Sequence, residues 1–229
     1  MSDQPRSRSV ERSVKRLLDL VLSGCGLVAF APILLAIALA IRISMGSPVL
    51  FRQVRPGYKG RPFAVVKFRS MREAFDQSGQ RLSDSERVTR LGRFMRRTSL
   101  DELPELWNVL RGEMSVVGPR PLLMEYLAWY TAEQMRRHDL RPGMTGWAQI
   151  HGRREVQMQE RIALDVWYVD HWSLRLDARI ILTTIGQVVR GQGAVPTTPV
   201  PITELGWATL TLQDPDGLGV AVPGPDVSA

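Results

Sequence analysis

The chain has 229 residues, a length that suits one ordinary domain with additions and at most two small domains. It carries 30 lysines and arginines against 23 aspartates and glutamates, and this formal charge of +7 favours an anionic partner such as nucleic acid, acidic lipid headgroups or a phosphorylated substrate. The single cysteine, Cys25, excludes an intrachain disulfide, and no CxxC motif or His/Cys cluster is present to bind zinc.

The N-terminal part of the chain combines a basic segment with a long apolar one. Residues 1–12 are polar and basic and are expected to be mobile. Residues 13–45 are predicted to form a membrane helix, because the stretch from Leu20 to Ile41 has no charge and is long enough to cross a hydrocarbon layer of roughly 30 Å. A cleaved signal peptide is the alternative, but the segment is long for a signal core and no small-residue cleavage pattern follows it.

The flanks and the middle of this apolar segment favour a helix that enters and leaves the membrane on one side. Lysines and arginines stand before residue 17 and after residue 41, which favours a cytoplasmic position for both ends. Pro32 removes a helical hydrogen bond and clashes with the preceding turn, so the helix is expected to kink or break there. A re-entrant helix broken at Pro32 fits both observations, and a kinked single span is the alternative.

A β-hairpin and several helices are predicted after the membrane segment. Residues 49–55 and 62–69 are rich in aromatic and β-branched residues, and the turn sequence Pro56–Gly60 lies between them. Helices are expected at about 87–97, 122–137, 156–172 and 177–190. The predicted fold is therefore α/β and mostly helical. Helices that carry Trp, Leu and Met beside Arg are amphipathic and either lie on the membrane interface or pack in the core.

The adjacent carboxylates Asp101 and Glu102 are the most informative feature of the sequence. They follow Arg96 and a second arginine, and carboxylates beside cations suit phosphate chemistry with Mg²⁺, which prefers oxygen ligands and shares phosphate oxygens. An aspartate is ionised at neutral pH and can attack phosphorus without a separate base. The alternative is a helix N-terminus, in which Ser99 caps the helix and Glu102 completes a capping box.

Other charged residues are candidates for substrate binding. Lys67, Arg69 and Arg96 can bind phosphates, although isolated basic residues are usually solvated. Arg120 stands between two prolines and after a glycine, so a fixed backbone is expected to aim its guanidinium. No Walker A, GxGxxG or GxSxG motif is present, which argues against ATP hydrolysis, a Rossmann site and a serine hydrolase.

Several segments in a fixed order carry a resemblance to a known family. They are Lys15–Asp19, the proline-broken helix, Pro48–Gln53, Val66–Met71, Thr98–Leu106, Ser115–Pro121, Pro142–Gln149 and Leu164–Val169. Together they resemble the monotopic phosphoglycosyl transferases, also called the bacterial sugar transferase family, and the likeness runs from about Lys15 to Gly193. The chain is similar to the small, stand-alone members of that family.

This resemblance implies the transfer of a sugar phosphate from a UDP-sugar to a polyprenyl (undecaprenyl) phosphate, with release of UMP. Asp101 matches the family's nucleophile, which forms a covalent phosphosugar intermediate that the lipid phosphate then attacks. Glu102, together with Asp101, is implied to hold Mg²⁺. Such a reaction starts the assembly of a bacterial surface glycan or glycoconjugate, such as an exopolysaccharide.

The resemblance also extends to further site residues. Lys67 and Arg96 match functional basic residues of the family, and Asp165 and Asp177 match later aspartates, for which a surface ion pair or a helix cap is the alternative. Arg153 matches the arginine of the family's Asn-Gly-Arg loop, which has a histidine in place of the asparagine here. This departure puts the sugar or nucleotide preference in doubt more than the reaction.

The implied organisation has four parts: a basic N-terminus at 1–12, a re-entrant helix at 13–45, a catalytic domain at 46–193 and an extension without an assigned role at 194–229. The resemblance places the domain on the cytoplasmic face of the bacterial inner membrane, in contact with membrane lipids and without a nucleic-acid partner. A homodimer is compatible with the sequence. A membrane-anchored binder of anionic ligands and an inactive scaffold of a glycan assembly complex are the alternative functions.

Overall fold

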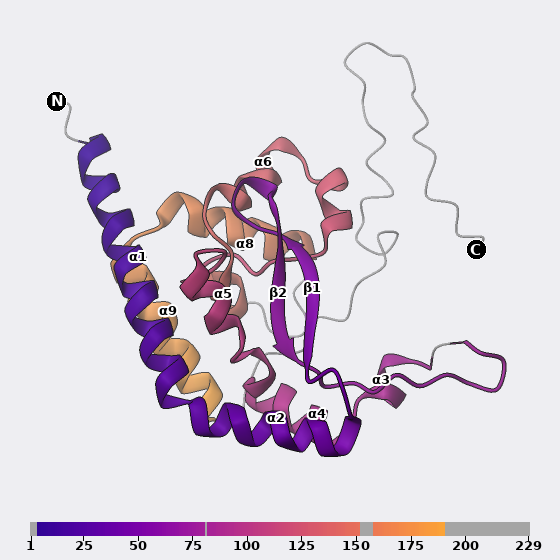
Figure 1. Ribbon diagram of the computed structural model, residues 1–229. Coiled ribbons are helices and arrows are strands. Elements are labelled where there is room, and N and C mark those ends of the chain that lie inside the picture. The colour runs from indigo at the N-terminus through magenta and orange to yellow at the C-terminus, as the bar shows by residue number, and fades with distance from the viewer. Residues whose placement is uncertain (1–3, 81, 152–157, 191–229) are drawn as a thin grey trace, which may run out of the picture. The chain divides into compact units, whose positions relative to one another are not determined.

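The computed structural model describes residues 4–80, 82–151 and 158–190 of the chain (Figure 1). Helices dominate these residues, as expected, and the strands form an antiparallel hairpin and a short parallel pair. The α-helices are α1 (Gln4–Ala29), α2 (Ala31–Met45), α3 (Asp84–Arg87), α4 (Arg90–Thr98), α5 (Glu105–Arg111), α6 (Ala132–Met135), α7 (Trp147–His151), α8 (Met158–His171) and α9 (Leu174–Val189). The 3₁₀ helices are η1 (Tyr58–Gly60), η2 (Leu100–Glu102), η3 (Met124–Trp129) and η4 (Arg136–Asp139), and the strands are β1 (Leu50–Pro56), β2 (Pro62–Phe68), β3 (Ser115–Val117) and β4 (Gly143–Thr145). The extension at 194–229 and Arg153 lie outside the described residues.

The apolar N-terminal segment forms two helices with a sharp bend between them. Only Phe30 separates α1 from α2, and the pair is bent by 60° (Figure 1). Pro32 lies in the first turn of α2 and has no N–H to donate to the carbonyl four residues earlier, which confirms the predicted break. The hydrogen-bond ladder resumes where Leu34 N–H donates to the Phe30 carbonyl at 2.8 Å. Neither helix alone is long and apolar enough to cross a membrane, whereas the bent pair meets that test of length and composition.

One face of α2 belongs to the core of the domain and the other does not. Ile37 and Ile41 are buried against Phe68 of β2 and Met95 of α4. On the outer face the apolar side chains are largely exposed: Leu35 by 71%, Leu39 by 61% and Ile43 by 77%. The helix is therefore apolar on both faces, but only one face has a protein partner among the described residues.

Polar side chains in α1 attach this helix to the domain. Asp19 is buried, and its Oδ1 accepts hydrogen bonds from Ser115 Oγ at 3.0 Å and from Val116 N–H at 2.9 Å. Arg16 donates to the carbonyls of residues 109 and 110, at 2.7 and 2.9 Å. These carbonyls are in the last turn of α5, where a cation satisfies free acceptors and complements the helix dipole.

Lys15 extends this attachment to α9. Its ammonium donates to the Val117 carbonyl at 3.0 Å and to Asp177 Oδ2 at 2.6 Å. Asp177 also accepts hydrogen bonds from the Tyr168 hydroxyl at 2.6 Å and from Trp172 Nε1 at 3.2 Å. Asp177, a candidate substrate-binding residue from the sequence, therefore lies in a buried network that joins α1, α8 and α9.

The predicted hairpin is confirmed. β1 and β2 are antiparallel, with Leu50 opposite Phe68 (Figure 1). The buried amide of Asn108 in α5 donates to the Ala64 carbonyl at 2.7 Å and accepts from Val66 N–H at 3.0 Å. Because both bonds reach the backbone of β2, they fix the hairpin against α5.

The predicted capping box at Ser99 is wrong. Ser99 has a left-handed backbone with φ of +57° and ends α4, and its side chain makes no capping hydrogen bond to the turn that follows. The carboxylate of Glu102 instead accepts from Lys67 and Arg120. A positive φ at Ser99 is incompatible with the extended geometry of an N-cap residue, so the local pattern for a cap is overridden.

Two further expectations differ from the structure. The helix expected over 122–137 is replaced by η3, α6 and η4, because Thr131 and Gln134 form their own capping box and start a new helix inside that range. At the N-terminus, α1 begins at Gln4, whereas the membrane helix was expected to begin at residue 13. Both differences concern where helices start rather than the helical class of the fold.

Replacing Lys15 with methionine is expected to lower the free energy of unfolding by about 2 kcal/mol, because Asp177 is left buried without its cation. Equilibrium guanidinium unfolding in detergent measures this change. Lys59→Met is the matched control: Lys59 pairs with Asp139 at the same 2.6 Å, but both of these side chains are exposed. The control is expected to change stability by less than about 0.5 kcal/mol. Equal effects of the two substitutions would contradict the role of burial.

Candidate active site

The carboxylates of the sequence motif are assembled by the turn between α4 and α5. Asp101 and Glu102 lie in η2, and Glu105 begins α5 after a proline. The side chain of Glu105 is only 3% exposed and that of Glu102 13% exposed. Lys67 of β2 lies between these two, with its ammonium 2.8 Å from Glu102 Oε1 and 2.9 Å from Glu105 Oε1. One ammonium therefore serves two buried carboxylates.

Arg120 approaches Glu102 from a different part of the chain. Its Nη2 donates to Glu102 Oε1 in a short contact, and its Nη1 is 3.4 Å from Glu102 Oε2. The guanidinium thus forms a two-pronged contact with the carboxylate, the arrangement that binds carboxylates and phosphates most strongly. Lys67, Glu102 and Arg120, all predicted from the sequence, are brought together by the fold.

The loop that carries Arg120 is fixed by contacts between glycine backbones. A Cβ atom added to Gly118 would lie 2.3 Å from the Arg141 carbonyl oxygen, and one added to Gly146 would lie 2.2 Å from the Gly118 carbonyl oxygen. The parallel pair β3–β4 brings these backbones together, with Gly118 N–H donating to the Thr145 carbonyl at 2.9 Å. The glycines are required here for close approach rather than for flexibility.

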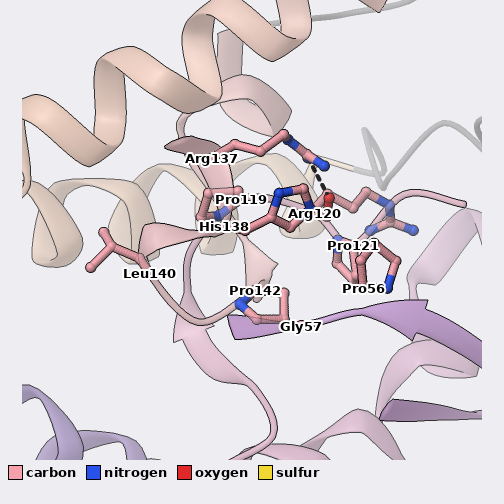
Figure 2. A pocket seen from close by; sticks show the side chains of 9 residues that line it. All are labelled: Pro56, Gly57, Pro119, Arg120, Pro121, Arg137, His138, Leu140 and Pro142. Atoms are coloured by element: carbon pink, nitrogen blue, oxygen red, sulfur yellow. Dashed lines mark hydrogen bonds between the residues drawn. The ribbon is translucent and has the colours of Figure 1, made fainter. Parts of the chain in front are cut away.

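Behind this loop lies a buried ion pair. Arg137 donates to the Arg120 carbonyl at 2.7 Å and to Asp165 Oδ2 at 2.6 Å, and its side chain is 1% exposed. Figure 2 shows the Arg137 guanidinium reaching the backbone of Arg120 in a small pocket walled by Pro56, Pro119 and Pro121, among other residues. Asp165, a candidate substrate-binding residue, contacts Arg137 and thereby supports the loop from behind.

The electrostatic environments of Asp101 and Glu102 differ. Burial opposes the ionisation of Glu102, but Arg120 and Lys67 together outweigh it and lower the pKa to about 2. Burial, with the negative charge of Glu102, raises the pKa of the Asp101 carboxyl above its usual range. Asp101 is half-buried and makes no ion pair with another described residue. Glu102 is therefore a fixed anion held by cations, while the Asp101 carboxylate is left free to act.

Glu105 is a third carboxylate that was not singled out from the sequence. Burial, with the charge of Glu102 nearby, raises the pKa of Glu105 to about 7 despite the contact with Lys67. The spacing could have indicated that Glu105 lies near Asp101 and Glu102, because residues three and four apart on a helical path share a face. Arg137 was also missed, and no local signal distinguishes it from other arginines.

The remaining candidates lie around this centre. Arg96 donates from Nε to Ser70 Oγ at 2.9 Å, and its charge acts on Asp101. Arg69 donates to the carbonyls of residues 45–47 at the end of α2 and is therefore engaged with backbone rather than with the carboxylates. Arg153, outside the described residues, stays a prediction from the sequence.

The carboxylates are compatible with Mg²⁺. In the described part of the chain, no three His, Cys, Asp or Glu side chains gather into a cluster that could hold a metal alone. Mg²⁺ commonly binds through only one or two carboxylates and takes its other ligands from water and substrate phosphates. The free Asp101 carboxylate beside Glu102 fits that requirement, and Glu102 contributes negative charge.

Comparison with known proteins settles the family. The sequence model of the family described as "Bacterial sugar transferase" matches residues 10–191. The chain belongs to the bacterial sugar transferase family. The resemblance seen in the sequence is thereby confirmed, and within this sugar transferase the matched range includes Asp101, Glu102, Lys67 and Arg120.

Three relatives show how much of the sugar transferase is shared. EpsL of Bacillus subtilis, named an uncharacterized sugar transferase, is 48% identical over 187 residues, which cover 82% of this chain and 93% of the relative. A UDP-glucose:undecaprenyl-phosphate glucose-1-phosphate transferase of Caulobacter vibrioides is 44% identical, over 79% of this chain and 71% of the relative. A protein of the same name from Escherichia coli is 42% identical, over 80% of this chain but 41% of the relative. The chain therefore spans nearly all of EpsL but about two fifths of the Escherichia coli protein.

Replacing Gly118 with alanine is expected to displace Arg120 and to lower the transferase rate at least tenfold, with a stability loss of about 1–3 kcal/mol from overpacking. Thermal unfolding and turnover of the purified enzyme measure the two effects. Gly186→Ala in α9 is the control, because a Cβ there meets no atom within 4 Å. Alanine is a better helix former, so the control is expected to leave activity unchanged and stability equal or slightly higher. Wild-type activity of Gly118→Ala would contradict the account of this loop.

The raised pKa of Glu105 predicts a pH-dependent stability. The folded protein keeps a proton on Glu105 up to about pH 7, while the unfolded chain loses it near 4.5, so this stabilisation is complete below pH 4.5 and is lost as the pH rises through 7. Glu105→Gln, neutral at every pH, removes this dependence. Without Mg²⁺, wild type is expected to lose on the order of 2 kcal/mol more than the variant between pH 5 and pH 8. Parallel stability curves from guanidinium unfolding would refute the prediction.

Proposed function

We propose that this sugar transferase moves a sugar 1-phosphate from a UDP-sugar to undecaprenyl phosphate and releases UMP. The observation that carries the proposal is the Asp101 carboxylate, which forms no ion pair with another described residue and lies beside Glu102, Lys67 and Arg120 in a chain of this family. Relatives named for glucose-1-phosphate transfer make UDP-glucose the first donor to test. Another relative is named an exopolysaccharide production protein, which supports a role in surface glycan assembly.

The reaction proceeds in two displacements at one phosphorus atom. In the first, a carboxylate oxygen of Asp101 attacks the phosphorus attached to the sugar, and the bond to the oxygen of the departing UMP breaks with its electron pair. In the second, an oxygen of the lipid phosphate attacks the same phosphorus, and the acyl-phosphate bond breaks. The second step restores the Asp101 carboxylate and leaves a polyprenyl diphosphate sugar.

The surrounding charges support these steps. Lys67 and Arg120 hold Glu102 as an anion and keep positive charge near the reacting phosphates. The raised pKa of Asp101, caused by burial and the charge of Glu102, makes its carboxylate more basic than that of an ordinary aspartate. Mg²⁺, bound by Glu102 with Asp101, would offset the negative charge of the diphosphate.

We further propose that the α1–α2 pair is a re-entrant membrane anchor and that the domain lies on the cytoplasmic face of the inner membrane. The 60° bend and the exposed apolar face of α2 support this placement. Both flanks of the pair are basic, which favours a single side for both ends. On α9, Leu182 is 70% and Val189 81% exposed, which supports contact between this helix and the lipid surface.

Asp101→Asn is expected to abolish UMP release, by at least a thousandfold, because an amide is a poor nucleophile. The assay uses detergent-purified protein, Mg²⁺, undecaprenyl phosphate and a panel of UDP-sugars. Wild type incubated with the donor alone is expected to gain the mass of one phosphosugar, which intact-mass spectrometry detects. The rate of this gain is expected to fall on acidification at a higher pH than an ordinary aspartate would give, because the pKa of Asp101 is raised.

Lys59→Met serves as the activity control, since Lys59 is exposed and pairs with Asp139 away from the carboxylates. Wild-type turnover in Asp101→Asn would refute the nucleophile. An absence of UMP with every donor, together with unchanged UDP binding by both proteins, would instead favour a binder or scaffold.

A further inference from the structure

A further arginine, Arg55, lies near Arg120 of the active site. Arg55 lies near the end of β1, directly before Pro56, and Pro56 and Arg120 line the same pocket (Figure 2). From the sequence, Arg55 was counted only among the basic residues after the membrane segment.

The register of the hairpin places Arg55 on the face that carries Lys67. Arg55 is paired with Phe63 and Lys67 with Phe51, so in an antiparallel pair the side chains of both basic residues project to one side of the sheet. Val65 lies on this side and is only 3% exposed, which shows that this face turns toward the domain. Arg52, three residues earlier, projects to the opposite side and is exposed.

The charge of Arg55 is only partly offset by carboxylates, because Glu125 and Glu105 act on it from beyond ion-pair distance. Among the described residues no acidic side chain lies within 4.0 Å of it, and its Nη2 donates to the neutral Gln53 side chain at 2.7 Å. Partial burial, with the positive charge of Arg120 nearby, lowers the pKa of Arg55. A half-buried guanidinium held near a second one is unfavourable without an anion, and it therefore marks a place where an anion binds well.

The cations of the site differ in whether they form an ion pair. Lys67 and Arg120 pair with Glu102, whereas Arg96 and Arg55 have only neutral partners in the described structure. Arg96 acts on Asp101, and Arg55 acts on Arg120. The two arginines, neither of which forms an ion pair among the described residues, thus place positive charge near different members of the active site, as a substrate with more than one phosphate requires.

We propose that Arg55 binds a substrate phosphate beside Arg120, as a second arginine of the phosphate-binding site. This inference rests on the proposed function, in which two sources of phosphate exist: the nucleotide phosphate of the donor and the phosphate of the lipid acceptor. A planar guanidinium can bind either one through two parallel hydrogen bonds.

The test compares ligand binding by the full-length protein in detergent, without turnover. Calorimetric titrations use UDP with Mg²⁺ in one arm and undecaprenyl phosphate in the other. Arg55→Gln retains a side chain that can bond Gln53 but removes the charge, and Arg52→Gln is the matched control on the same strand. Arg55→Gln is expected to weaken one ligand at least tenfold, while the control binds both ligands as wild type does.

The titration in which affinity falls identifies the phosphate that Arg55 binds. Weaker UDP binding assigns Arg55 to the nucleotide phosphate, and weaker lipid binding assigns it to the acceptor phosphate. Arg55→Met, which keeps the apolar stem, is measured with a thermal unfolding curve so that loss of packing is separated from loss of charge. Unchanged affinity for both ligands in either folded variant overturns the proposal.

The same samples distinguish this inference from the proposed function. UMP release by wild type is assayed in parallel with undecaprenyl phosphate and the same panel of UDP-sugars, UDP-glucose included. If wild type binds UDP through Arg55 but releases no UMP with any donor, the phosphate site stands and the transfer reaction fails. If UMP is released but neither ligand depends on Arg55, the reaction stands and the role of Arg55 fails.

Discussion

The buried carboxylate of Glu102 is the constraint on which the active site depends. A charge removed from water must be paired, and its partners Lys67 and Arg120 come from a hairpin strand and from a loop more than fifty residues later in the chain. Their attraction to one carboxylate holds the hairpin, η2 and the loop together. In the described part of the chain Asp101, the neighbouring residue, forms no ion pair of its own, although Lys67 and Arg96 act on its charge. The ion pairs of Glu102 therefore do two things: they join three segments of the chain, and they place Lys67 and Arg120 near Asp101.

A second layer of polar contacts supports the first. Arg137 holds the backbone of Arg120 and is itself held by Asp165, so the orientation of the loop that carries Arg120 depends on an ion pair in the interior. On the other side of the domain, Asp19 and Lys15 connect α1 to β3 and α9. Three of these contacts end on backbone groups, namely the carbonyls of Arg120 and Val117 and the amide of Val116, and they fix the positions of whole segments rather than of single side chains.

The sequence predicted the features that depend on local chemistry. The break before Pro32 follows from a missing N–H group, and the hairpin follows from strand-forming residues around a Pro-Gly turn. Lys67, Glu102 and Arg120 were each candidates from the sequence, but their convergence required the fold, because the contacts between them span long separations in the chain. The predicted capping box at Ser99 is absent because Ser99 ends α4 with a positive φ and the Glu102 carboxylate binds Lys67 and Arg120 instead. Nothing near Arg137 in the sequence indicates that it is buried, so its role required the fold.

The bent helix pair has a mechanical consequence. Its first helix is attached through Arg16 and its neighbours, and the carbonyls at the end of the second accept hydrogen bonds from Arg69, so both ends of the apolar hairpin are tied to one folded body. A single transmembrane helix can tilt to follow a bilayer of changing thickness. The α1–α2 pair is attached to the domain at both ends, so it cannot tilt unless the whole domain tilts as well. In the membrane placement proposed above, the height of Asp101 and Glu102 relative to the lipid surface would then be set by the protein rather than by the thickness of the bilayer.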